Sequence, residues 1–350
     1  MKKRYFHNIT SWDLPKKNER SIYLGKIAES HYEAYLDIDE LTKHMIIAGS
    51  TGGGKTIAAQ IIAEEAFSKG IAIAVIDPTA QWTGFIKELE ENAIKKKYGN
   101  FGMKKDSAKS YPTRIINLDK NRHFTQPEEF LSKEVITVLA ATDLLEREID
   151  AAIAEIINLF FKNTSQEHEE LQTLLFFEEI HRILPKYGGT GSGLIALERA
   201  VREFRKWGIG IVLISQVLED FVGEIRANIG TEMQLRTSYE VDLDKIILKY
   251  GDEMAKAVVR EETGTLMMHN SSYNIGKPFF INIRPPMHDV HRLSNKELQK
   301  YYLIDEKISE LANSKLSEQD EFTIKLARKE LLRGNMRMAE TYVDEVSQKK

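Results

Sequence analysis

Short apolar runs rich in isoleucine and valine alternate along the chain with longer segments of helical periodicity. This alternation is typical of a mostly parallel β-sheet covered by helices on both faces, because strands in such a sheet are buried on both sides. The pattern therefore predicts an α/β fold. The predicted strands cover residues 44–49, 71–77, 114–118, 134–139, 173–178, 210–215, 232–237 and 264–269, and the helices between them include 55–69, 143–162 and 194–207.

Three regions follow from this pattern. The α/β core covers residues 41–286, and residues 1–40 form a short N-terminal β element or arm that is too short to fold alone. Pro285 and Pro286 end the core, since the residue before a proline is biased away from helix. Residues 287–350 form a helical extension, whose last part has two helical patterns split at Gly334 and predicts a hairpin docked on the core.

Composition and charge exclude few functions. The 350 residues are 42% hydrophobic and 29% charged with a formal net charge of −4, as in many folded proteins. Because there is no cysteine, disulfides, thiolate metal sites and cysteine nucleophiles are excluded. The basic N-terminus lacks the apolar stretch of a secretory signal, and no run reaches the length of a membrane span. We therefore expect a cytoplasmic protein.

Residues 87–109 are rich in lysine, with Lys95, Lys96 and Lys97 in succession. Two interpretations remain open. The segment is either a solvated surface insertion or a flexible loop whose lysines contact backbone phosphates, which needs no fixed geometry.

The most informative motif is GSTGGGKT, which follows an apolar strand and precedes an amphipathic helix. This is the context of a P-loop, in which backbone N–H groups and the helix N-terminus surround the phosphates of ATP. Lys55 is expected to reach the β- and γ-phosphates, and the Thr56 hydroxyl is expected to bind Mg²⁺. The predicted ATP-binding residues are Gly49, Ser50, Thr51, Gly52, Gly53, Gly54, Lys55 and Thr56.

Hydrolysis also needs a carboxylate near the metal and a base for the attacking water. The apolar run LQTLLFF ends in Glu178 and Glu179, which predicts both groups at the end of one strand. Glu178 is expected in the Mg²⁺ shell, although aspartate is more usual there, and Glu179 is expected to polarise the water.

Two further polar residues follow predicted strands, at the sheet edge where ligands bind in such folds. Gln216 is expected to sense the γ-phosphate or position the water, with a loop-bonding role as the alternative. Asp77 is expected to bind Mg²⁺ through water or to orient Lys55. An aspartate before proline also forms turns, so a purely structural role stays open for Asp77.

The motif blocks together resemble the HerA/FtsK family of P-loop ATPases, most closely the HerA-type helicase core. The resemblance covers about residues 40–286. In that family a Walker B strand ends in Glu-Glu-Ala-His, and an arginine-rich helix runs into a Gly-Ile-Gly strand that ends in Ser-Gln. The blocks that carry the resemblance are HMIIAGSTGGGKT, AVIDPTAQW, LLFFEEIHRILP, AVREFRKWGIGIVLISQ and MQLRTS.

The resemblance implies a RecA-like homohexameric ring that translocates double-stranded DNA, with ATP held between subunits. It also implies an arginine finger from the neighbouring subunit, for which Arg205 is the first candidate, Arg202 the second and Arg236 the third. Ordinary pairing on the helix surface is the alternative role of these arginines. Lys43 stands where the family tends to have arginine, which costs bidentate reach.

The chain departs from the family at its N-terminus, because only about 40 residues stand where HerA-type proteins usually have a β-barrel. This favours a plasmid, viral or defence-system translocase with another effector over a helicase paired with the nuclease NurA. Two other functions stay open: a conjugation- or secretion-type assembly ATPase that moves protein or nucleoprotein, and a nucleotide-regulated scaffold. The glycines of 188–193 form a flexible loop or a loop that faces the pore of the ring. The Asn-Lys-x-Asp motif of GTPases is absent.

Overall fold

One large mixed sheet is the frame of the computed structural model, which describes residues 13–183, 191–216 and 223–348. Within these residues the sheet has eleven strands in the order β2-β1-β11-β10-β9-β3-β8-β7-β4-β6-β5. The strands are β1 Ser21–Ile27, β2 Glu33–Asp37, β3 Met45–Ala48, β4 Ala72–Asp77, β5 Thr113–Asn117, β6 Ile136–Ala140, β7 His168–Phe177, β8 Trp207–Ser215, β9 Thr231–Gln234, β10 Thr265–Asn270 and β11 Phe279–Ile283.

The sheet is parallel over most of its width. All pairings from β9 through β3, β8, β7, β4 and β6 to β5 are parallel. Strands β10, β11, β1 and β2 add an antiparallel margin beside β9. The predicted mostly parallel α/β sheet is thus confirmed, and the N-terminal β element extends the same sheet.

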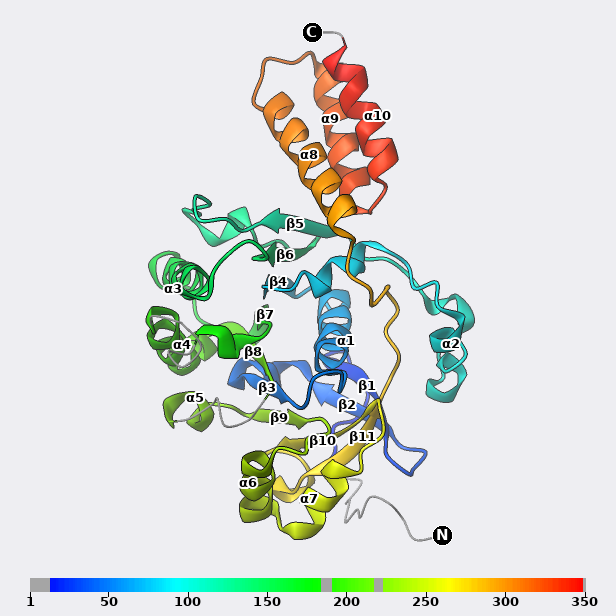
Figure 1. The fold of residues 1–350 in the computed structure, drawn as a ribbon, viewed down its shortest axis with the longest axis vertical. Coiled ribbons are helices and arrows are strands. Elements are labelled where there is room, and N and C mark those ends of the chain that lie inside the picture. The colour runs from blue at the N-terminus through cyan, green and yellow to red at the C-terminus, as the bar shows by residue number, and fades with distance from the viewer. Residues whose placement is uncertain (1–12, 184–190, 217–222, 349–350) are drawn as a thin grey trace.

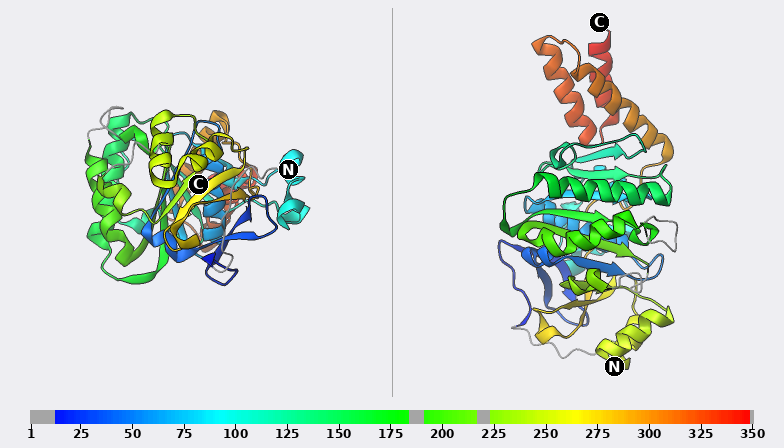
Figure 2. Two further views of the ribbon diagram at one scale, coloured as in Figure 1. Left: turned by 90° about the horizontal axis from the view of Figure 1, so that it is seen from below. Right: turned by 90° about the vertical axis from the view of Figure 1, so that its left-hand side faces the viewer.

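Helices cover both faces of the sheet and extend it at both ends. Helices α3 and α4 lie on one face and α1 on the other, while α8 to α10 project beyond β5 and α6 and α7 lie at the opposite end (Figures 1 and 2). No helix within the described residues is long and apolar enough to cross a bilayer. The helices are α1 Lys55–Ser68, α2 Asn92–Lys95, α3 Glu146–Asn163, α4 Ser192–Glu203, α5 Gly223–Ala227, α6 Glu240–Tyr250, α7 Asp252–Val259, α8 Asn295–Ala312, α9 Glu318–Leu332 and α10 Met336–Ser347.

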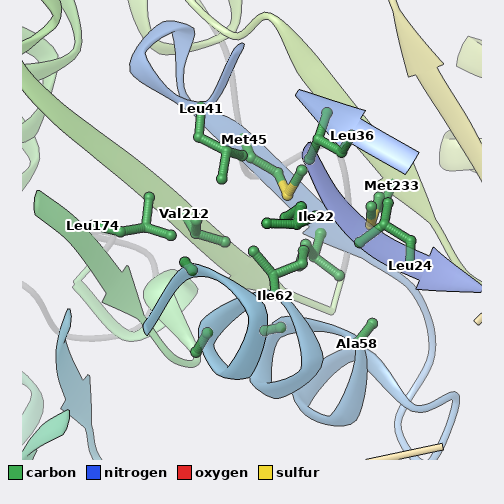
Figure 3. Close-up of a cluster of buried hydrophobic side chains, with 14 of the residues drawn as sticks. Ile22, Leu24, Leu36, Leu41, Met45, Ala58, Ile62, Leu174, Val212 and Met233 are labelled. Carbon is green, nitrogen blue, oxygen red and sulfur yellow. The ribbon is translucent and has the colours of Figure 1, made fainter. Parts of the chain in front are cut away.

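The central strands bury both of their faces, which explains their continuous apolar sequences. On β3, Met45 and Ile47 pack with α1, and the alternating residues Ile46 and Ala48 face the core under α3 and α4. Figure 3 shows the α1 side of this core, where Ile62 lies among side chains of β1, β3 and β8. The P-loop helix is therefore fixed against the middle of the sheet.

Each predicted strand overlaps an observed one, but some boundaries and elements differ. The helix predicted to end at Trp207 ends at Glu203, a short 3-10 turn follows, and β8 already begins at Trp207. Trp207 packs against Phe161 and Phe204, so tertiary packing takes it into the strand. The prediction also lacked β11, α6 and α7.

The C-terminal helices are present as predicted, and α8 is attached to the sheet by Tyr301. This buried side chain accepts a hydrogen bond from the Ile115 amide (3.2 Å) and donates one to the Thr113 carbonyl (3.2 Å), both on the edge strand β5. Helices α9 and α10 form the predicted hairpin, with Gly334 in a left-handed conformation (φ 79°) between them.

A buried histidine holds the start of β3 to its neighbours. His44 donates from Nε2 to the carbonyl of Val201 (3.0 Å) and accepts at Nδ1 from the amide of Ile211 (3.1 Å). Both contacts need a neutral ring, because Nδ1 must keep its lone pair. Burial accordingly lowers the pKa of His44 to about 4.

We predict that His44→Gln reduces the loss of stability at acid pH. The pKa of His44 is lower in the folded than in the unfolded chain. Above pH 6.5 both states are neutral at this group, so it does not reduce the free energy of unfolding. Below pH 6.5 the unfolded chain takes up a proton that the folded chain does not, and the free energy of unfolding falls. Between pH 7 and 4.5 this group costs about 2 to 3 kcal/mol. Urea unfolding at several pH values measures the effect, with the exposed His123→Gln as control. An undiminished loss in His44→Gln would contradict the assignment.

Candidate active site

The P-loop joins β3 to α1 and depends on glycine at two positions. Gly49 has φ 151°, and a Cβ there would lie 2.8 Å from Cβ of Leu235. Gly54 has φ 96° at the start of α1, a conformation that residues with a side chain rarely adopt. The segment after β9 is hydrogen-bonded to the P-loop and the end of β3. The amide of Leu235 donates to the carbonyl of Ala48 (2.8 Å), and the amide of Ser50 donates to the carbonyl of Arg236 (2.9 Å).

Lys55 and Thr56 begin α1 and point toward the strand ends. The Lys55 ammonium donates to the carbonyl of Ser50 (3.2 Å) and is largely buried. Burial lowers the pKa of Lys55, while the negative charges of Glu179 and Glu178 raise it. The ammonium thus lies near both glutamates, and its contact with the phosphates stays a prediction.

Glu178 lies directly after β7 and is held from two sides. Its Oε1 accepts from the Thr56 hydroxyl (2.8 Å), and its Oε2 accepts from the indole N–H of Trp82 (2.9 Å). The side chain is almost fully buried, and burial together with the nearby Asp77 raises the pKa of Glu178 to about 8. The predicted metal pair of Thr56 and Glu178 is therefore in direct contact.

Asp77 ends β4 and organises the turn that follows it. Its Oδ1 accepts from the amide (2.9 Å) and hydroxyl (2.8 Å) of Thr79, and its Oδ2 accepts from the amide of Trp82 (2.9 Å). Burial raises the pKa of this carboxyl, although these hydrogen bonds favour its charged form. The turn-forming role is thus visible, and a role at the metal stays a prediction.

Glu179 has a left-handed backbone (φ 50°), which is uncommon for a residue with a side chain and typical of functional sites. This conformation brings its carboxylate to two polar partners. Gln216 Nε2 donates to Glu179 Oε2 (3.3 Å), and Nδ1 of His181 lies 3.1 Å from the same oxygen. The structure therefore brings Gln216 and Glu179 together from β8 and β7, as the strand ends predict.

The candidate arginines lie at opposite ends of the parallel strands, because Arg202 and Arg205 precede β8 and Arg236 follows β9. Arg202 lies in the last turn of α4 and forms an exposed ion pair with Glu224, whereas Arg205 is exposed and has no ion pair among the described residues. Arg236 follows β9, and its carbonyl supports the P-loop. Lys43 pairs with Glu40 (2.7 Å). Of the glycine-rich loop, residues 188–190 lie outside the described residues.

The sequence interpretation missed three residues of the site. Trp82 binds Glu178, Leu235 packs under the P-loop glycines, and His181 lies beside Glu179. A signal existed for Trp82 and His181, since both stand within motif blocks a few residues after a strand. The position of Leu235 depends on β9 pairing with β3, and no local pattern reports that.

The geometry fits a divalent cation of the magnesium type. Thr56 and Glu178 supply hard oxygen ligands, and Mg²⁺ sites with nucleotides commonly use one or two carboxylates together with phosphate oxygens. A buried carboxylate with a raised pKa also gains from a nearby positive charge. Within the described residues, no group of three or more histidine, aspartate or glutamate side chains forms a metal cluster.

A family model described as "Helicase HerA, central domain" matches residues 22–346. The chain belongs to this HerA central-domain family. Membership makes it an ATP-binding P-loop ATPase of the HerA type, which confirms the resemblance found in the motif blocks. The match also includes most of the C-terminal helices. A search of the curated proteins found no match.

Several solved structures align with this HerA-family chain at low identity. VirB4 of Thermoanaerobacter pseudethanolicus aligns with a TM-score of 0.51 and 13% identity, over 81% of this chain and 99% of that chain. The genome packaging NTPase B204 from Sulfolobus turreted icosahedral virus 2 with ATPγS gives 0.41 and 12%, over 69% and 97%. The pCW3 conjugation coupling protein TcpA gives 0.44 and 14%, over 81% and 70%. The VirB4 likeness supports the P-loop ATPase fold.

We predict that Trp82→Phe lowers both stability and ATPase activity. The change keeps an aromatic ring but removes the donor to Oε2 of Glu178, and a buried unsatisfied oxygen costs about 1 to 3 kcal/mol. Urea unfolding and steady-state turnover measure the two effects. Trp207→Phe is the matched control, since Trp207 packs through its ring against Phe161 and Phe204. Unchanged turnover in Trp82→Phe would show that the indole does not position Glu178.

Proposed function

We propose that the chain is an ATP-driven translocase of double-stranded DNA that works as a homohexameric ring. The observation that carries this proposal is the pair of glutamates after β7: Glu178 contacts the P-loop Thr56, and Glu179 contacts Gln216. In a chain of the HerA family, this arrangement supports an ATPase in which Glu178 faces the metal ion and Glu179 faces the attacking water.

In the proposed reaction, Glu179 is the general base that polarises the attacking water. Its backbone is left-handed, Gln216 donates a hydrogen bond to its Oε2, and Nδ1 of His181 lies 3.1 Å from the same oxygen. A base fixed in this way acts without reorganising, which is how preorganised groups lower a barrier. Gln216, which directly follows β8, would then contact the γ-phosphate and transmit its presence or absence to that strand.

Mg²⁺ is the proposed metal, with Thr56 and Glu178 as the protein ligands and Asp77 as an outer group. When bound, it would neutralise charge on the β- and γ-phosphate oxygens. Lys55 binds the same phosphates, and its burial strengthens that interaction because little water competes for the ammonium.

The position of Arg205 supports a site shared between subunits. Arg205 precedes β8, whereas Gln216 follows it, so the two lie at opposite edges of the sheet. The nine residues of β8 span roughly 30 Å at about 3.3 Å per residue. Arg205 is thus too far from the P-loop of its own chain to contact it, but it is exposed and can contact the P-loop of another copy. Arg202, in contrast, already pairs with Glu224.

A nuclease or another effector protein would give the motor its task, and a cytoplasmic location follows from the work on DNA. An assembly ATPase that moves protein or nucleoprotein is the second candidate, because a P-loop ATPase fold alone does not specify what is moved. DNA dependence of turnover is the property that distinguishes the two functions.

We predict that duplex DNA stimulates ATP hydrolysis and that Glu179→Gln abolishes turnover while ATP still binds. Loss of a general base costs about 10² to 10⁴ in rate. Steady-state phosphate release with and without duplex DNA measures the first effect, and calorimetric binding of ATP measures the second. Glu169→Gln, an exposed glutamate on the same strand, is the control. Turnover that is indifferent to DNA, with no DNA binding, would refute translocation.

We predict that Arg205→Ala and Lys55→Ala proteins are each inactive but recover activity when mixed. In a mixed ring, a P-loop with Lys55 can receive Arg205 from a neighbour that lacks Lys55. Equal mixing gives competent sites at about a quarter of positions if subunits assemble at random. Arg199→Ala, on α4 and paired with Glu203, is expected to retain activity.

Sedimentation with ATP and duplex DNA shows in parallel whether rings form. Wild-type turnover by Arg205→Ala alone, or a monomer under every condition, would contradict the shared site.

A further inference from the structure

A cavity of about 450 Å³ opens beside the P-loop. It begins at Gly53, Gly54 and Ile57, which are the end of the loop and the first turn of α1. The residues assigned to hydrolysis, namely Thr56, Glu178 and Glu179, do not line this cavity. The volume lies within the range of about 300 to 1,000 Å³ that is common for small-molecule sites.

The walls of this cavity combine apolar surface with a few polar groups. Ile57, Phe101 and Pro285 supply apolar surface, and Asn100 and Thr263 supply groups that can hydrogen-bond. Such walls suit a flat heteroaromatic ring that carries donors and acceptors on its edge. Lys97 adds a positive charge to the lining.

One wall comes from the lysine-rich insertion, which is anchored to the core. Leu89, Tyr98 and Ala108 form a small apolar cluster inside the insertion. The Tyr98 hydroxyl donates to Pro286 O (2.7 Å), and the Tyr23 hydroxyl donates to Phe101 O (3.0 Å). The insertion is therefore anchored to the core at these points although most of its residues are exposed; Figure 1 shows it around α2.

The orientation of a bound nucleotide follows from the two sides of the P-loop. Thr56 touches Glu178, so the β- and γ-phosphates belong on that side. A nucleoside attached to the other end of the phosphate chain must then leave past Ile57, the next residue of α1. The cavity is the space that opens there.

We propose that this cavity binds the nucleoside of the nucleoside triphosphate and that the insertion, through Phe101 and Lys97, is a recognition wall for it. The inference rests on the proposed function, because it presupposes that the P-loop holds the phosphates. The proposal also assigns different roles to two neighbouring lysines of this segment. Both Lys96 and Lys97 are exposed, but only Lys97 lines the cavity.

The test compares binding of ATPγS with binding of inorganic tripolyphosphate by calorimetry in Mg²⁺ buffer. Phe101→Ala is expected to weaken ATPγS binding about tenfold, in line with the loss of one aromatic contact, and to leave tripolyphosphate binding unchanged. Lys97→Ala is expected to weaken ATPγS binding about threefold, while the neighbouring Lys96→Ala binds like the wild type. Thermal melting confirms that each variant is folded, and the exposed Lys97 gives a readout that does not disturb packing.

The outcomes separate this inference from the proposed function. If Lys55→Ala loses ATPγS binding but Phe101→Ala and Lys97→Ala keep it, the insertion has no role in recognition and the inference is wrong. Equal losses in Lys97→Ala and Lys96→Ala would also overturn it, since they would indicate only a general field of positive charge. If the wild type binds neither ligand, the inference falls together with the proposed ATPase.

Discussion

The contact between Thr56 and Glu178 is the interaction on which the site depends. It joins the first turn of α1 to the end of β7, and the indole of Trp82 holds the second carboxylate oxygen from the turn after β4. Three segments far apart in sequence therefore meet at one buried carboxyl group. Because that group is almost fully buried, each lost partner leaves an oxygen unsatisfied, and the three segments are held in a single arrangement.

A second buried network ties the far end of α1 to the end of the core. Arg284 pairs with Glu64 (2.7 Å) and Glu65 (2.9 Å), and His288 Nδ1 lies 2.6 Å from Glu64. The charge of Arg284, with hydrogen bonds from His288 and the backbone, lowers the pKa of Glu64 to about 2 despite its burial. Arg284 also lines the cavity beside the P-loop. The phosphate loop and the wall of the cavity are thus parts of one packed unit.

Much of this arrangement could be predicted from the sequence, because the relevant rules are local. Apolar runs gave the central strands, and the rule that ligands gather at the carboxyl ends of parallel strands placed Glu179 near Gln216. The support of the P-loop by Leu235 could not be predicted, since it requires β9 to lie beside β3 in the sheet. The strand start at Trp207 was missed because packing outweighs local preference there, whereas α6 and α7 have a helical pattern that the sequence interpretation did not include.

The attachment of α8 has a consequence for how copies of the chain can associate. An edge strand normally exposes backbone groups that can pair with a strand of another molecule. On β5, Tyr301 occupies the amide of Ile115 and the carbonyl of Thr113. A strand from another molecule could pair with this part of β5 only by displacing the Tyr301 hydroxyl. The buried hydroxyl of one tyrosine on α8 thus protects backbone groups of an edge strand, so the docking of the C-terminal helices also limits sheet-to-sheet pairing at this position.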